Sequence, residues 1–184
     1  AKEAGIPDGV LNVIPGYGDV GEALGRHEDV DAVSFTGSTE VGGLFMKYSG
    51  ESNLKTIGLE MGGKSPFIVL DDAKITDDLI DNAINSAFWN GGQNCSANMR
   101  QIIHSKVKDE FLDKVTKKVK ALKVGDPLDP TSNMGSMISK KHLATVDGFI
   151  QKGIDEGAKL LFGGVSGKEQ KGFYAKPTLF DDLN

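Results

Sequence analysis

Apolar runs typical of strands alternate with amphipathic stretches along the whole chain. Residues 30–35 alternate polar and apolar side chains as a strand does, and residues 40–48 follow with a helical pattern. The same order recurs where the apolar run 66–70 precedes a helical stripe of apolar side chains within 75–88. Strands that alternate with helices are typical of βαβ units on a parallel sheet, so we predict an α/β fold.

The remaining elements are predicted from the same two periodicities. We expect further strands at residues 10–14, 55–61, 101–104 and 173–180, and further helices at residues 19–27, 108–123 and 140–156. Ser139 is the expected N-cap of the last helix, and residues 163–172 are expected to form a loop. No internal repeat or low-complexity tract interrupts this order.

The Gly62-Gly63 pair is the expected boundary between two domains. Residues 1–61 have the pattern of a nucleotide-type βαβ unit, whereas the helices lengthen and the glycines thin out in residues 62–184. The chain also begins at residues 1–5 with what reads as the last turn of a helix before a glycine cap. We therefore expect the end of one domain and the start of another, cut from a longer protein.

Composition argues against several functional classes. The 26 acidic residues outnumber the 21 basic ones, giving a net charge of −5, and no Lys/Arg cluster points to nucleic acid or an anionic membrane as a partner. No apolar run approaches the ~20 residues that span a bilayer, and no signal peptide opens the chain. A single cysteine forms no internal disulfide and no zinc motif, so we expect no metal site and a reducing, cytoplasmic setting.

Glycine is overrepresented, and two glycine loops compete as phosphate sites. The stretch 16–21 matches the dinucleotide fingerprint G-x-G-x-x-G after a predicted strand, but Pro15 and the negative Asp19 argue against it. Its alternative is a tight surface turn. In the stretch 35–43, a glycine allows close approach of a ligand and the following helix presents free N–H groups to an anion. Its alternative is an ordinary helix capped by Ser or Thr.

Cys95 follows the polar, glycine-containing stretch 91–94. A lone cysteine is most often buried and unreactive, but we expect this loop to open a helix, whose N-terminus would favour the thiolate. Cys95 is therefore either a packing residue or a nucleophile. A papain-like thiol would need a histidine partner, and none of His27, His104 and His142 has an evident tie to this loop.

Glu60 lies among apolar residues and glycines at the end of the predicted strand 55–61. A carboxylate that is half-buried there would have a raised pKa, which suits a general base near neutral pH. The alternative is a glutamate on an edge strand that faces solvent.

Three motifs, in this order, resemble the NAD(P)-dependent aldehyde dehydrogenase superfamily. They are Phe35-Thr36-Gly37-Ser38-Thr39-x-x-Gly42, Leu59-Glu60-Met61-Gly62-Gly63-Lys64-Ser65-Pro66 and Gly92-Gln93-Asn94-Cys95. The separation of 35 positions between Glu60 and Cys95 also agrees with the family. The resemblance covers essentially the whole chain. It implies that residues 1–61 are the C-terminal part of a Rossmann-like NAD(P)-binding domain and residues 62–184 the N-terminal part of an α/β catalytic domain.

The resemblance also implies a role for each matching residue. Cys95 would be the nucleophile that forms a thiohemiacetal and then a thioester, and Glu60 the general base for thioester hydrolysis. The Cys95 backbone N–H would supply half of an oxyanion hole. The residues implied to bind NAD or NADP are Thr36, Gly37, Ser38, Val41 and Met61. Those implied to line the aldehyde tunnel are Trp89, Asn94 and Ser96.

Family members are far longer than this chain, so the resemblance implies that flanking parts of both domains are missing. The parent protein is expected to be a homodimer or homotetramer acting on a small-molecule aldehyde. We expect the isolated chain to be catalytically incomplete. Two alternatives belong to other classes: a non-catalytic folded fragment or binding module, and a cysteine hydrolase or acyltransferase, against which the lack of a histidine partner argues.

Overall fold

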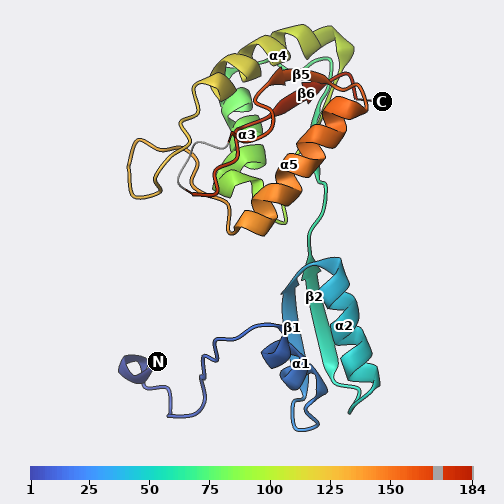
Figure 1. Ribbon diagram of the computed structural model, residues 1–184, viewed down its shortest axis with the longest axis vertical. Coiled ribbons are helices and arrows are strands. Elements are labelled where there is room, and N and C mark those ends of the chain that lie inside the picture. The colour runs from blue at the N-terminus through green and yellow to red at the C-terminus, as the bar shows by residue number, and fades with distance from the viewer. Residues whose placement is uncertain (168–171, 184) are drawn as a thin grey trace. The chain divides into compact units, whose positions relative to one another are not determined.

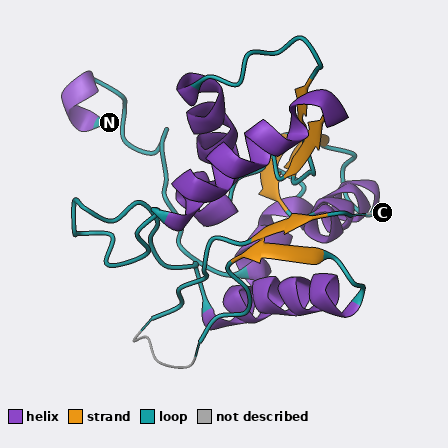
Figure 2. Cartoon of the chain, turned by 90° about the horizontal axis from the view of Figure 1, so that it is seen from above, coloured by secondary structure: helices purple, strands orange, loops and turns teal. Residues whose placement is uncertain are grey.

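The chain folds into two compact units, Ala1–Gly62 and Gly63–Asn184. The computed structural model describes residues 1–167 and 172–183, with helices and strands in both units (Figure 2). The division falls within the glycine pair at residues 62 and 63. The cofactor and catalytic identities of the two parts stay predictions.

The first unit contains a parallel strand pair, the α-helix that connects the two strands, one further α-helix and a short 3-10 helix (Figure 1). Its elements are η1 (Lys2–Ala4), α1 (Gly18–Arg26), β1 (Ala32–Gly37), α2 (Thr39–Gly50) and β2 (Thr56–Met61). In the register of β1 and β2, Ala32 lies opposite Thr56 and Gly37 opposite Met61. Since α2 connects two parallel strands, β1, α2 and β2 form the predicted βαβ unit.

Aromatic packing holds α2 against β1. The Phe45 ring centroid lies 4.9 Å from that of Phe35 in β1 and 5.9 Å from that of Tyr48 one turn along α2. The other helix, α1, approaches this cluster through Gly25, which is buried. A Cβ at this glycine would lie 2.8 Å from the Tyr48 ring, so the absence of a side chain allows α1 and α2 to pack closely.

The second unit contains two strand pairs and three long helices. Its elements are β3 (Pro66–Val69), α3 (Asp77–Phe88), η2 (Trp89–Gly92), β4 (Arg100–Ile103), α4 (Ser105–Lys120), α5 (Lys140–Asp155), β5 (Lys159–Phe162) and β6 (Leu179–Asp181). The strands β3 and β4 pair in parallel, and β5 and β6 pair antiparallel. The core lies where α3 and α4 pack together and against β3, and its buried side chains are Val69, Ile75, Ile80, Ala83, Ile84, Phe111, Val115 and Val119.

The predicted α/β class and its parallel strand pairing are confirmed. The strand expected at residues 10–14 is wrong: this segment pairs with no described strand, and Val13 is 86% exposed. β-Branched residues favour extended backbone, but a strand also needs a partner for its N–H and C=O groups. Of the strand expected at 173–180, only residues 179 and 180 are in a strand, β6, which continues to residue 181. The loop expected at 163–172 lies partly outside the described residues.

Within residues 1–167 and 172–183, no helix has the length and apolar character needed to span a bilayer.

Candidate active site

The residues predicted to bind the cofactor come together at the C-terminal ends of β1 and β2 and the N-terminus of α2. Gly37 ends β1 opposite Met61, which ends β2. Ser38 is the N-cap of α2, and its hydroxyl accepts a hydrogen bond from the Val41 N–H at 3.3 Å. Thr36, the fifth of these residues, precedes Gly37 in the same strand. The capped helix weighed as the alternative is therefore present at this position.

The capping of α2 leaves donors free for an anion. Among the hydrogen bonds of the described residues, none is donated by the backbone N–H of Thr39 or Glu40 in the first turn. The positive end of the helix dipole lies at the same place. A phosphate group could therefore accept two backbone hydrogen bonds beside Gly37, so the cap and an anion site are compatible.

Glu60 lies next to this group, opposite Thr36 in the β1–β2 ladder. Along β2, residues 57, 59 and 61 are half-buried, whereas residues 56, 58 and 60 are exposed. Of the two positions that the sequence left open for Glu60, half-buried and solvent-facing, the structure has the solvent-facing one. The reason is the two-residue period of the strand, which directs residue 60 to the face opposite that of its half-buried neighbours.

Cys95 lies in the turn between η2 and β4, and it is exposed. Its thiol donates a weak hydrogen bond to the Asn94 Oδ1 at 3.8 Å. The expectation that this loop opens a helix is wrong. Asn98 instead directs the chain into β4, since its backbone N–H bonds to the Ser86 carbonyl and its side-chain amide donates to the Pro66 carbonyl.

Of the three residues predicted to line an aldehyde tunnel, Trp89 and Ser96 are exposed and Asn94 is half-buried. Trp89 is 66% exposed in η2. The Asn94 side-chain amide donates to the Ser96 hydroxyl at 3.1 Å, so the two side chains bracket Cys95.

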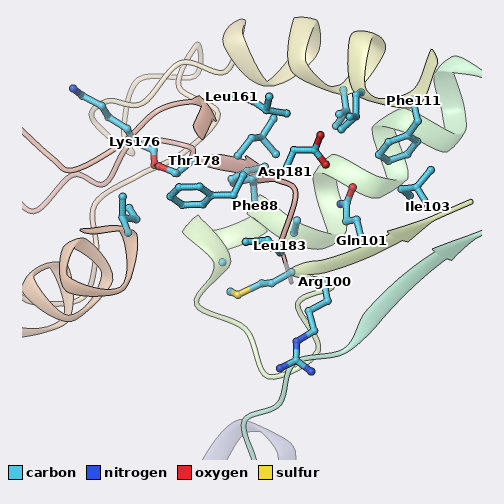
Figure 3. A pocket seen from close by; sticks show the side chains of 18 of the residues that line it. Phe88, Arg100, Gln101, Ile103, Phe111, Leu161, Lys176, Thr178, Asp181 and Leu183 are labelled. Carbon is cyan, nitrogen blue, oxygen red and sulfur yellow. The ribbon is translucent and has the colours of Figure 1, made fainter. Parts of the chain in front are cut away.

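A groove of about 1000 Å³ lies within the second unit (Figure 3). Phe88, Gln101, Phe111 and Asp181 are among the residues that line it, and Figure 3 shows their side chains. None of the residues predicted for the thiol site or the aldehyde tunnel lines this groove.

In the loop that carries Cys95, the sequence did not reveal the structural role of Gln93. Its side chain bonds to the backbone of Ile138, which lies 45 positions away. A contact at that separation leaves no periodicity or spacing in the sequence. Across the described residues, no group of three or more His, Cys, Asp or Glu side chains is placed to hold a metal ion.

Comparison with known proteins identifies the family. The family model described as "Aldehyde dehydrogenase family" matches residues 1–184. Aminoacetaldehyde dehydrogenase of Pseudomonas aeruginosa is 43% identical over 185 residues, which cover 100% of this chain and 37% of that protein. Human retinal dehydrogenase 2 is 43% identical over 183 residues, which cover 99% of this chain and 35% of that protein.

The fold agrees with this relationship. The NAD+ complex of an aldehyde dehydrogenase from Bacillus cereus matches with a TM-score of 0.93 at 40% identity, covering 100% of this chain and 37% of that one. This chain thus spans a little over a third of the length of these relatives. Because the family model matches every residue and the fold agrees, the chain belongs to the aldehyde dehydrogenase family.

Proposed function

We propose that the protein containing this chain oxidises an aldehyde to a carboxylic acid, with NAD or NADP as hydride acceptor and Cys95 as nucleophile. The observation that carries this proposal is the family match over all 184 residues. The exposed position of Cys95, the single cysteine of the sequence, supports it because a nucleophile must be accessible to its substrate.

The cofactor would be held at the N-terminus of α2. The N–H groups of Thr39 and Glu40 would donate to its pyrophosphate beside Gly37, with Val41 near the adenine and the Met61 backbone near the nicotinamide. The solved structure of a relative with this fold is an NAD+ complex, which supports NAD or NADP as the cofactor. When bound, the nicotinamide ring supplies a hydride acceptor.

Cys95 would act first. Its Sγ, as a thiolate, attacks the carbonyl carbon of the aldehyde and forms a thiohemiacetal, while the Cys95 backbone N–H donates to the developing oxyanion. Loss of hydride from the same carbon leaves a thioester on Sγ. The aldehyde carbon is thereby oxidised while the bond to the protein is kept.

Glu60 would act in the second half of the reaction. Its carboxylate removes a proton from a water molecule whose oxygen attacks the thioester carbon, and the C–S bond then breaks. The carboxylic acid leaves and the Cys95 thiolate is regenerated. The exposed position of Glu60 on β2 is consistent with a base that must reach water.

The remaining roles are also part of this proposal. Trp89, Asn94 and Ser96 would line the path of the aldehyde. A cytoplasmic homodimer or homotetramer is proposed for the parent protein. The alternative for the isolated 184-residue chain is a folded but catalytically incomplete polypeptide, because the chain spans about a third of the length of its relatives. NADH formation by the isolated chain would contradict that alternative.

The proposed reaction is tested in the full-length protein by comparing Cys95→Ala and Glu60→Gln with wild type. Cys95→Ala is expected to abolish NADH formation, because no carbon–sulfur bond can form. Glu60→Gln is expected to give a burst of about one NADH per active site and then stop at the thioester. The matched control is Glu28→Gln, an exposed glutamate outside the proposed site, which should turn over normally. Sustained NADH formation by Cys95→Ala would overturn the proposal.

A further inference from the structure

The segment before Cys95 has an unusual backbone. Asn90, Gly91 and Gly92 are three consecutive residues with left-handed φ angles of 52°, 65° and 76°. Glycine adopts this region freely and asparagine does so more readily than most residues with a Cβ, but consecutive left-handed residues are uncommon. Contacts made with residues outside the run add to its stability.

Gln93 makes contacts of this kind through both polar atoms of its side-chain amide. Its Nε2 donates to the Asn90 carbonyl at 3.1 Å, and its Oε1 accepts from the Ile138 backbone N–H at 2.9 Å. The Asn90 side-chain amide donates back to the Gln93 carbonyl at 3.2 Å. The Gln93 backbone N–H also donates to the Asn90 carbonyl, at 3.2 Å, so the side-chain amide reinforces a turn that the backbone closes and attaches it to a segment that is distant in the sequence.

The segment around Ile138, to which Gln93 bonds, is held by buried contacts of its own. Met137, next to Ile138, is 2% exposed, and its backbone N–H donates to the Phe173 carbonyl at 2.7 Å. The Met137 methyl group lies 2.5 Å from the position of a Cβ at Gly91, so it packs directly against the left-handed turn. The loop is therefore attached to a buried part of the second unit.

We propose that Gln93 is a positioning residue that fixes the 90–92 turn against Ile138 and so holds the Cys95 thiol in place for attack. This inference rests on the proposed function, in which Cys95 is the nucleophile. Among the described residues, no hydrogen bond joins the Gln93 side chain to the Cys95 thiol, which donates to Asn94. It acts through the backbone, two residues before Cys95, and a small displacement of a reacting atom is costly to rate.

The inference is tested by steady-state kinetics in the full-length protein. Gln93→Met keeps the length of the side chain but removes both hydrogen bonds, and Gln93→Glu keeps the acceptor for Ile138 but loses the donor to Asn90. We expect Gln93→Met to lower kcat by about tenfold or more, with the KM for NAD+ within about twofold of wild type. Gln93→Glu should be intermediate, because the Ile138 bond can still form.

Gln101→Met is the matched control. The Gln101 side chain also donates to a backbone carbonyl, that of Ala83 at 3.1 Å, but from β4 and not from the Cys95 loop. It should lower the denaturation midpoint without lowering kcat. The inference is overturned if Gln93→Met keeps wild-type kcat, or if Gln101→Met loses as much. If Gln93→Met does not fold, the same comparison is made with Gln93→Glu. A wild-type protein that forms no NADH would instead overturn the proposed function, so the two failures are distinguishable.

Discussion

The Sδ atom of Met61 lies 2.7 Å from the position that a Cβ would take on Gly42. Gly42 is buried in the first turns of α2, and Met61 ends β2, so the missing side chain of one residue accommodates the thioether of the other. The proposed cofactor site is thus built around a close approach of helix and strand.

Two glycine substitutions should show that a flexible side chain accommodates an added Cβ better than aromatic rings do. Gly42→Ala displaces only a flexible thioether, whereas Gly25→Ala places a Cβ 2.8 Å from the Tyr48 ring and 3.2 Å from the Phe45 ring. Both substitutions replace glycine in a helix, but only Gly25→Ala meets aromatic rings, so we expect Gly25→Ala to be less stable than Gly42→Ala by about 1–3 kcal/mol. Urea denaturation measures the difference. Equal midpoints would contradict the packing described for α1 and α2.

Ser38→Ala should separate capping from cofactor binding. Loss of the bond from the Val41 N–H to the Ser38 hydroxyl is expected to cost about 1 kcal/mol. Thr76→Ala removes the corresponding cap of α3, a bond from the Leu79 N–H, at a similar cost. In the full-length protein, only Ser38→Ala should raise the KM for NAD+. A rise of equal size in Thr76→Ala would show that helix stability alone affects the KM.

Core packing in the second unit is tested with two phenylalanines. Phe111 is 1% exposed and belongs to the α3–α4 core, whereas Phe149 is 70% exposed on α5. Phe111→Ala is expected to lower the free energy of unfolding by about 3–5 kcal/mol, since it leaves a cavity. Phe149→Ala should change it by less than about 0.5 kcal/mol. Thermal or urea denaturation measures both, and a larger loss for Phe149→Ala would contradict the assigned core.

The ion pair between Asp181 and Lys108 should make stability depend on pH. Burial alone would raise the pKa of Asp181, but the ion pair with Lys108 Nζ at 2.9 Å and the Asp182 N–H hold that pKa below its ordinary value. A lowered pKa in the folded state gives stability that is present at neutral pH and lost as pH falls through the folded pKa.

Asp181→Asn is therefore expected to lower the denaturation midpoint at pH 7, with the gap to wild type closing below about pH 4. Asp182→Asn is the control, because Asp182 contacts the same lysine from a more exposed position. Its effect at pH 7 should be smaller. A gap for Asp181→Asn that is constant from pH 7 to pH 3 would exclude this linkage.

Elements with local signals could be predicted from the sequence. The helix expected at 140–156 with Ser139 as its N-cap is found at 140–155, where the Ser139 hydroxyl accepts from the His142 N–H. The local structure of residues 36–41 was also predictable, because a strand end, a glycine and a capped helix are consecutive in the chain; its role in cofactor binding stays a prediction. Such features need only neighbouring residues to form.

Features that depend on distant partners could not be predicted. Residues 10–14 have the composition of a strand but no partner in the described structure. The strand β5 was missed, and it pairs with β6 from a later part of the sequence. The exposure of Glu60 depends on which face of β2 is covered, which composition does not reveal. The bond from Ile138 to Gln93 likewise joins residues that only folding brings together.

The parallel ladder that sets Thr36 opposite Glu60 has a consequence for exchanging segments between relatives. A transplanted segment 32–61 would carry the proposed cofactor loop and the Glu60 carboxylate together and would keep the register between β1 and β2. Transplanting β2 alone risks a slip of one residue, which would turn Glu60 onto the α2 side and direct Met61 away from Gly42. Chimeras of this family should therefore be joined outside β1 and β2 and not between them.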